Sequence, residues 1–178
     1  NQLESCSREE IVNAYDNAVL YTDHFLGETI EWLNQLDNQF ENQFDTSLLY
    51  VGDHGESLGE RNLFLHGLPY RFAPDTQKHV PLIFWFGKNW PENDMKTLTN
   101  LAQKGSAISH DNVSHTLLGL FDIDTALYEK DQDILAMKLW YLTPTQNTEV
   151  KFYLRKPPIV EKYVYYYSPS SRLFFFLR

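Results

Sequence analysis

Two short apolar runs, separated by a long irregular segment, constrain the fold of this 178-residue chain more than any other feature. Residues 47–51 and 80–86 are almost entirely apolar, which is typical of β-strands that are buried on both faces. Residues 52–78 between them contain glycine and proline and show no clear period, apart from one helical turn expected near residues 57–61. A loop of this length inside a compact domain is usually functional or disordered.

Helical patterns flank both strands. Ser7 and Glu10 form a capping box, in which the hydroxyl accepts from the third helical N–H and the carboxylate reaches back to the cap. Apolar residues then recur at helical spacing and predict a helix over about residues 8–36, and shorter helices are expected at 95–103 and 109–121. Helices that alternate with fully apolar strands predict an α/β sandwich with a mostly parallel sheet, whose ligands gather at the carboxyl ends of the strands.

The composition narrows the class of protein. Hydrophobic residues make up 43% of the chain and the mean hydropathy is −0.43. No apolar run reaches the roughly eighteen residues that a membrane span needs. A formal net charge of −9 argues against nucleic acid as a partner, because a phosphate backbone selects basic surfaces. The chain begins at Asn1 and not at methionine, so we expect it to be a piece of a longer protein.

The charge changes sign near Leu139, where we place a boundary. Residues 1–138 hold 9 Lys and Arg against 22 Asp and Glu, whereas residues 139–178 hold 6 against 2. The second segment also carries 11 of the 27 aromatic residues. A change of charge and of aromatic content at one point indicates that two segments of different origin meet there.

The stretch Gly52-Asp53-His54-Gly55-Glu56 directly follows the first expected strand and holds the candidate site. Adjacent strand residues point to opposite faces, so Asp53 and His54 can bind one ion only if the chain leaves strand geometry there. Gly52 and Gly55 permit this, since glycine accepts backbone angles that other residues resist. A carboxylate oxygen and a neutral imidazole nitrogen suit Zn²⁺.

Two further residues of the loop extend this site. Glu56 could orient a histidine from outside the coordination sphere, or meet a substrate ammonium group. His66 could bind a second ion, hold a phosphate oxygen or donate a proton to a leaving group. The competing interpretation is an Asp-His pair that stands between glycines by chance; the strand end, Glu56, His66 and the long loop favour a metal site.

Four other residues have structural interpretations. His79 opens the second strand, where packing or a backbone hydrogen bond is favoured over ligation. His110 and Asp111 stand at a helix start, where capping and the helix dipole account for them. Cys6 is the single cysteine, so it is either an inert structural thiol or half of a bridge to a partner upstream.

Three stretches together resemble a known family. Residues 50–85, YVGDHGESLGERNLFLHGLPYRFAPDTQKHVPLIFW, are similar to the sequence signature of the lipid A phosphoethanolamine transferases. These are membrane-anchored, zinc-dependent enzymes that include the mobile colistin-resistance proteins. Residues 13–30 and 109–123 resemble the same family, and the resemblance covers about residues 6–138 in family order.

The resemblance implies an alkaline phosphatase/sulfatase-like α/β/α sandwich, incomplete in this chain, on the periplasmic face of the bacterial inner membrane. It implies transfer of phosphoethanolamine from phosphatidylethanolamine to lipid A through a zinc-bound phospho-threonine, with one or two zinc ions. Asp53 and His54 match the zinc-binding Asp-His pair of the family. His66 matches a histidine near a second zinc or the substrate, Glu56 a position lining the same pocket, and Cys6 the second half of a family disulfide.

The chain also departs from the family. No threonine of this chain stands in the family's nucleophile context, and we expect the Glu ligand and the transmembrane anchor to belong to a segment outside it. After Met137 the resemblance stops, so we expect residues 1–138 to be the C-terminal part of the catalytic domain and residues 139–178 to be a frameshifted or foreign tail. The first alternative is therefore an inactive truncated fragment that at most binds metal weakly. The second is a sulfatase or phosphoglycerol transferase of the same superfamily, which would lack the wording LFLHGLPY.

Overall fold

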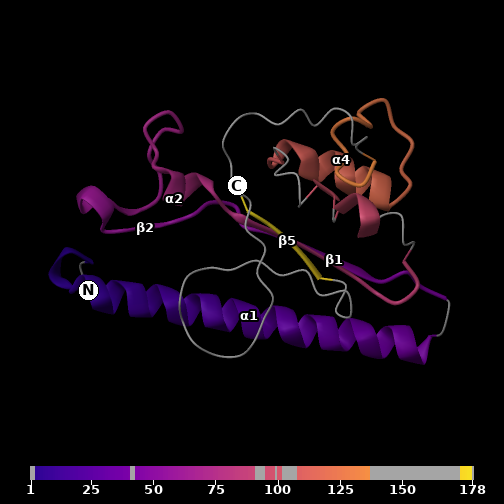
Figure 1. Ribbon diagram of the computed structural model, residues 1–178, viewed down its shortest axis with the longest axis horizontal. Coiled ribbons are helices and arrows are strands. Elements are labelled where there is room, and N and C mark those ends of the chain that lie inside the picture. Colours follow the sequence, from indigo (N-terminus) through magenta and orange to yellow (C-terminus); the bar gives the residue numbers. More distant parts are fainter. Residues whose placement is uncertain are drawn as a thin grey trace.

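A computed structural model of the chain describes residues 3–40, 43–90, 95–98, 100–101, 108–136 and 173–177. The described helices and strands are η1 (Leu3–Ser5), α1 (Arg8–Gln39), β1 (Ser47–Val51), β2 (Ser57–Leu58), η2 (Glu60–Asn62), β3 (Phe64–Leu65), α2 (Asp75–Lys78), β4 (Pro81–Phe86), α4 (Asp111–Leu120) and β5 (Leu173–Leu177). Figure 1 shows the strands between α1 on one side and α4 on the other. No helix in these described ranges has both the length and the apolar character that crossing a membrane requires.

The central sheet corrects the expectation of a mostly parallel arrangement. Its strands follow the order β1-β4-β5, and both pairs that the structure describes are antiparallel, with Ser47 opposite Phe86 and Val51 opposite Leu82. The chain leaves β1 and enters β4 at the same end of the sheet, so the segment between them only has to turn back. A parallel pair would need a crossover that carries the chain to the opposite end.

Strand β4 forms the centre of the core. Its residues Leu82, Phe84 and Phe86 share one face of the strand and are buried. They pack in one cluster with four residues from the segments that follow, namely Leu98, Leu101, Ile108 and Ile134. Burial on both faces is confirmed for β4 but is wrong for β1, which is only half-buried because it has a single partner strand in the described sheet.

Helix α1 begins as predicted and ends at a buried carboxylate. The capping box is present: Glu10 N–H donates to Ser7 Oγ at 3.3 Å, and Ser7 N–H donates to Glu10 Oε2 at 2.8 Å. Near the other end, Asp37 is 4% exposed and accepts from Thr46 Oγ1 at 2.6 Å and from the Lys88 N–H at 3.3 Å. These bonds fasten the helix to the chain just before β1 and just after β4.

Helix α4 also matches its predicted position and is fastened to the loop that follows it. Thr116 Oγ1 donates to the Asn112 carbonyl at 2.7 Å and accepts from the Ile134 N–H at 3.0 Å. Asn112 Nδ2 donates to the Gln132 carbonyl at 2.9 Å. The helix predicted over 95–103 is described at 95–98 and 100–101, and of the tail 139–178 only β5 lies in the described residues.

The segment between β1 and β4 is more ordered than expected. The helical turn predicted near residues 57–61 is only partly matched, because Ser57–Leu58 form β2 and η2 lies at Glu60–Asn62. The segment also contains β3, which pairs antiparallel with β2, and the four-residue helix α2. Five residues in it have a positive φ: Gly59, Arg61, Asn62, Leu65 and Gly67. Three of these are not glycine, a conformation that costs energy and tends to occur at functional sites.

A candidate metal centre at the end of β1

The two glycines that flank Asp53 and His54 are needed for space and not for unusual backbone angles, which corrects the sequence-based interpretation. Neither Gly52 nor Gly55 has a left-handed φ. The Gly52 N–H donates to the Pro81 carbonyl at 2.9 Å, and the Gly55 N–H donates to the Gln77 carbonyl at 3.1 Å. A Cβ at Gly55 would collide with the carbonyl oxygen of Thr76. The loop can therefore lie against α2 only because residue 55 has no side chain.

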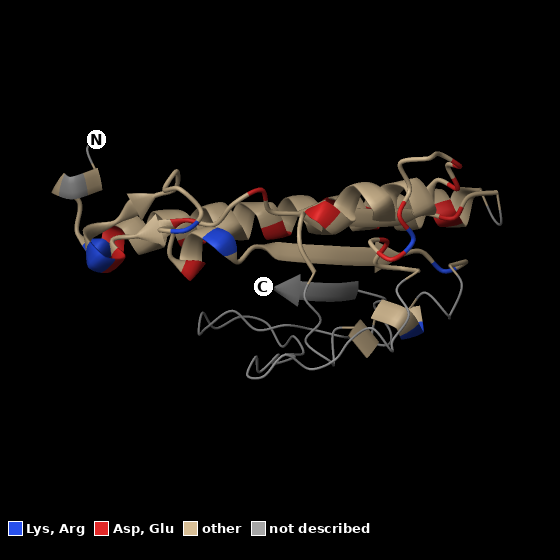
Figure 2. Cartoon of the chain, turned by 90° about the horizontal axis from the view of Figure 1, so that it is seen from above, with Lys and Arg blue, Asp and Glu red and all other residues tan. Residues whose placement is uncertain are grey.

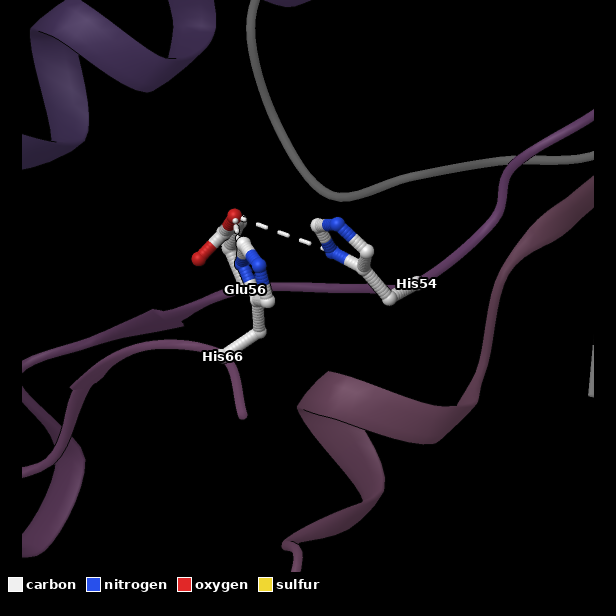
Figure 3. A group of neighbouring side chains, drawn as sticks. All are labelled: His54, Glu56 and His66. Atoms are coloured by element: carbon white, nitrogen blue, oxygen red, sulfur yellow. Dashed lines mark hydrogen bonds and ion pairs between the residues drawn. The ribbon is translucent and has the colours of Figure 1, made fainter. Parts of the chain in front are cut away.

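The structure brings together three of the four predicted site residues. Potential ligand atoms of His54, Glu56 and His66 all lie within 4.8 Å of one another. Figure 3 shows the Glu56 carboxylate beside the two imidazoles. Oε1 of Glu56 is 2.8 Å from Nδ1 of His66 and 3.8 Å from Nδ1 of His54. The two rings stack with their centroids 3.5 Å apart.

Asp53, the fourth predicted residue, lies beside this cluster and faces solvent. Its Oδ2 atom is 3.7 Å from Nε2 of His54, on the other side of that ring from Glu56. The His54 N–H donates to Asp53 Oδ1 at 3.0 Å and, with the nearby His54 ring, holds the pKa of Asp53 below its ordinary value. An aspartate is ionised at neutral pH, as a metal ligand must be, and the lowered pKa extends this to more acidic pH.

Glu56 provides an independent sign that the cluster can hold a cation. Its Oε2 atom is buried and receives no hydrogen bond from any of the described residues. A buried carboxylate oxygen without a donor is costly, and a bound cation would compensate it. Burial, and after it the negative charge of Glu56, raises the pKa of Tyr15 on α1, so Tyr15 is a neutral phenol near the carboxylate.

A second layer of hydrogen bonds supports the loop from α2. Gln77 Nε2 donates to Ser57 Oγ at 2.8 Å, and both residues are buried. Ser57 Oγ also lies 3.4 Å from Thr76 Oγ1. Because Ser57 directly follows Glu56, these contacts hold the carboxylate in place.

His110 is the site neighbour that sequence reasoning missed. It occupies the N-cap position of α4, yet its ring makes no capping hydrogen bond to the described helix, so the expected capping role is wrong. Its Nε2 atom lies instead 2.7 Å from the Gly52 carbonyl, 58 positions earlier in the chain. Since the carbonyl can only accept, the ring donates. Gly52 is thus held through both its N–H and its carbonyl, directly before Asp53.

His79 and Cys6 lie outside the cluster. His79 is exposed, and its N–H donates to the Asp75 carbonyl at 2.8 Å, which agrees with a structural role. Cys6 is half-buried before α1, where its N–H donates to the Leu3 carbonyl at 3.1 Å.

Sequence comparison finds known relatives of this chain. The family model described as "Sulfatase" matches residues 2–123. The phosphoethanolamine transferase EptA of Salmonella typhimurium is 42% identical over 137 residues, which is 76% of this chain and 24% of that protein. The phosphatidylethanolamine transferase Mcr-1 of Escherichia coli is 44% identical over 132 residues, 74% of this chain and 22% of that protein. The chain thus spans about a quarter of the length of these curated relatives.

Solved structures agree. The C-terminal periplasmic domain of phosphoethanolamine transferase EptC from Campylobacter jejuni superposes with a TM-score of 0.62 at 42% identity, over 76% of this chain and 41% of that one. The integral membrane lipooligosaccharide phosphoethanolamine transferase A from Neisseria meningitidis gives a TM-score of 0.68 at 38% identity, over 76% and 25%. The described part of this chain therefore shares its fold with a portion of each.

Proposed function

Because the chain belongs to the sulfatase family and is homologous to the phosphoethanolamine transferases, we propose that it is the metal-binding portion of such a transferase. In this proposal the whole protein moves phosphoethanolamine from phosphatidylethanolamine to lipid A at the periplasmic face of the inner membrane. One observation carries it: a carboxylate with an unsatisfied buried oxygen lies beside two stacked imidazoles, inside the segment that the family model matches.

Asp53 and His54 fit a ligand pair for one Zn²⁺. The 3.7 Å between Asp53 Oδ2 and His54 Nε2 is close to the roughly 3.4 Å that separates two ligands placed about 2.1 Å from a tetrahedral ion. The lowered pKa of Asp53 extends the pH range in which this ligand is charged to more acidic pH. When bound, the ion would lower the pKa of a coordinated hydroxyl group and neutralise charge on phosphoryl oxygens.

Glu56 and His66 are proposed to orient and bind the substrate. Glu56 Oε1 forms a hydrogen bond with Nδ1 of His66 at 2.8 Å and so orients that ring. Nδ1 of His54, in contrast, lies 3.3 Å from the Gly55 carbonyl and 3.8 Å from Glu56. The Nε2 atom of each ring is left for a ligand. The buried Oε2 of Glu56 would accept a cation, either the ammonium of phosphoethanolamine or a second Zn²⁺. His66 is then placed to hold a phosphoryl oxygen or to donate a proton to the leaving group.

The nucleophile is expected from a part of the whole protein outside the matched segment, since the relatives are about four times as long as that segment. A threonine oxygen there would attack the phosphorus of phosphatidylethanolamine, and diacylglycerol would leave. A phosphate group of lipid A would then attack the phospho-threonine and release the threonine. Two in-line transfers through one nucleophile predict ping-pong kinetics, with the protein supplying mainly positioning and charge stabilisation.

A chimaera tests this proposal. Residues 1–138 would replace the matching segment of Escherichia coli Mcr-1, and transfer would be measured from a fluorescent phosphatidylethanolamine. We expect transfer by the chimaera and its loss in Asp53→Ala and His54→Ala, with His24→Ala as the control because His24 is exposed in the middle of α1.

Two outcomes would contradict the proposal. If Asp53→Ala and His54→Ala left transfer intact, the site assignment would be wrong. If the 178-residue chain alone catalysed transfer, the expectation of an external nucleophile would be wrong. The alternative of an inactive fragment predicts a different result: the chain at most binds zinc weakly, and the chimaera does not catalyse transfer.

A further inference from the structure

The loop that carries His66 exposes several large apolar side chains. Tyr70 is 80% exposed and Phe72 is 65% exposed, and Leu65 and Leu68 are exposed as well. Figure 1 shows this segment as a loop that extends beyond α2 at one end of the molecule. Four large apolar side chains within eight residues form a patch of the kind that marks an interaction site.

This loop has a defined shape. The N–H groups of Phe72 and Ala73 both donate to the Pro69 carbonyl, at 2.8 and 3.0 Å. Ala73 is buried, so the turn is anchored at its end while Tyr70 and Phe72 remain outside. Leu65 and Gly67, at the start of the loop, have φ angles of 62° and 106°. The exposed side chains are therefore presented by a built turn.

The charge of the loop is opposite to that of the chain. Residues 61–74, which lie between Glu60 and Asp75, contain two arginines, Arg61 and Arg71, and no acidic residue, whereas the whole chain carries −9. Figure 2 shows Asp and Glu outnumbering Lys and Arg across the described residues. The Arg71 guanidinium lies 4.8 Å from the centroid of the Phe72 ring. The Lys78 ammonium lies 5.3 Å from the centroid of the Tyr70 ring and is paired with Asp75 at 3.3 Å.

We propose that residues 61–74 rest on an anionic lipid surface. Aromatic rings partition to the headgroup level of a bilayer, and neighbouring cations bind its phosphates. An apolar patch alone would suit a protein partner equally well, but the acid-free arginine pair within an acidic chain favours a negatively charged layer. Because His66 lies in the same loop, this contact would deliver a lipid headgroup to the candidate metal centre, a consequence that rests on the function proposed above.

Vesicle co-sedimentation of the 178-residue chain tests this inference. Vesicles of phosphatidylethanolamine with one third phosphatidylglycerol would be compared with phosphatidylethanolamine and phosphatidylcholine vesicles of no net charge. We expect binding to the anionic vesicles and its loss in high salt. Arg71→Glu should weaken the binding by about 25-fold, because each unit of charge near the surface changes the affinity roughly fivefold. Tyr70→Ser with Phe72→Ser should bring the binding to background.

A matched control distinguishes specific binding through the loop from non-specific binding through any exposed aromatic side chain. Tyr21 and Phe25 on α1 are 72% and 60% exposed, so Tyr21→Ser with Phe25→Ser removes two equally exposed aromatics elsewhere. We expect this double variant to bind like the wild type. Equal binding to both vesicle types, or loss of binding only in the α1 variant, would overturn the proposal.

Sedimentation velocity without lipid tests whether the apolar patch binds a second copy of the chain instead of a lipid surface. If the wild type self-associates and the Tyr70→Ser, Phe72→Ser variant does not, the patch is a contact between copies and the lipid proposal is wrong. The vesicle assay needs neither zinc nor turnover, so its failure would leave the proposed transferase function standing. Loss of transfer in the chimaera would likewise leave the lipid contact standing.

Discussion

The two ends of the β1–β4 pair each hold a carboxylate beside a glycine, and the two carboxylates differ in how far they are satisfied. At one end, Asp37 accepts a hydrogen bond on each oxygen, and a Cβ at the neighbouring Gly87 would collide with it. At the other end, Glu56 Oε1 bonds His66 Nδ1 at 2.8 Å and lies 3.8 Å from His54 Nδ1, and Oε2 has no donor from the described residues. The number of carboxylate oxygens that accept hydrogen bonds from the protein therefore distinguishes a structural carboxylate from a candidate ligand-binding one.

Removing a ligand at the unsatisfied end should have the largest effect. We expect His54→Ala to lower the affinity for Zn²⁺ by more than the roughly 10- to 100-fold that loss of a supporting outer partner costs. The free energy of unfolding without metal should change little, because the His54 side chain is partly exposed. Competition with a chromophoric zinc chelator and urea melts measure the two quantities. An unchanged zinc affinity would remove His54 from the site.

The saturated end should show the opposite pattern. Asp37→Ala leaves the Thr46 hydroxyl and the Lys88 N–H without their acceptor, so we expect the free energy of unfolding to fall by about 2–3 kcal/mol. Zinc affinity should stay within twofold of the wild type. Asp37→Asn keeps one acceptor oxygen and should lose less stability. If Asp37→Ala clearly lowered the zinc affinity and left the free energy of unfolding unchanged, the proposed contrast between the two ends would be wrong.

His110 tests whether the unsatisfied end depends on distant support. Removing its hydrogen bond to the Gly52 carbonyl in His110→Ala should weaken zinc binding about tenfold, the lower end of the range for an outer partner. His110→Gln can still donate and should recover part of the loss. The electronic spectrum of the Co²⁺-loaded chain should change in the alanine variant, because the geometry of Asp53 and His54 would relax. An unchanged spectrum and affinity would make His110 a purely structural residue.

A second saturated carboxylate, Asp133, predicts the smallest effect. Its Oδ2 accepts from the Tyr128 hydroxyl at 2.7 Å, and this bond, with burial, raises the pKa of Tyr128 to about 12. The folded chain keeps this proton to higher pH than the unfolded chain, whose tyrosines titrate near 10. The stabilisation is therefore complete below about pH 10 and is lost as the pH rises through about 12.

Tyr128→Phe should remove this pH dependence and lower the free energy of unfolding at pH 8 by about 1 kcal/mol, since the Asp133 oxygen loses one donor. Urea melts at pH 8 and pH 11 for both proteins measure the effect. Equal loss of stability between these pH values in wild type and variant would contradict the assignment.

The elements that could be predicted from sequence are those whose signals are local. The capping box and the apolar spacing predicted α1, and the two apolar runs predicted β1 and β4, because these patterns depend on neighbours a few residues apart. Strand direction was wrong, since an apolar run carries no information on which end of the sheet the chain re-enters. The closeness of Glu56 to His54 and His66 is confirmed, while the ligand role of Asp53 and His54 stays a prediction.

The contact between His110 and Gly52 could not be predicted for the same reason. It joins residues 58 positions apart, and His110 stands where a cap is the usual interpretation. The only available hint was that a histidine is a poor N-cap residue, whose ring was therefore available for another partner. The space requirement at Gly55 was hidden too, because it arises from α2, which the sequence did not predict.

Helix α1 connects the two ends compared above and sets their relative phase. It has 32 residues, Arg8–Gln39, and so extends about 48 Å. At its start the Arg8 guanidinium lies 3.8 Å from Glu60 in the metal-site loop, and near its end lies the buried Asp37. One residue inserted at its exposed middle would rotate one end by about 100° against the other, so only one anchor could remain in place. Seven inserted residues would nearly restore the angle but add about 10 Å of length. The number of residues in α1 therefore sets the distance and the angle between the buried Asp37 and the loop of the candidate metal centre.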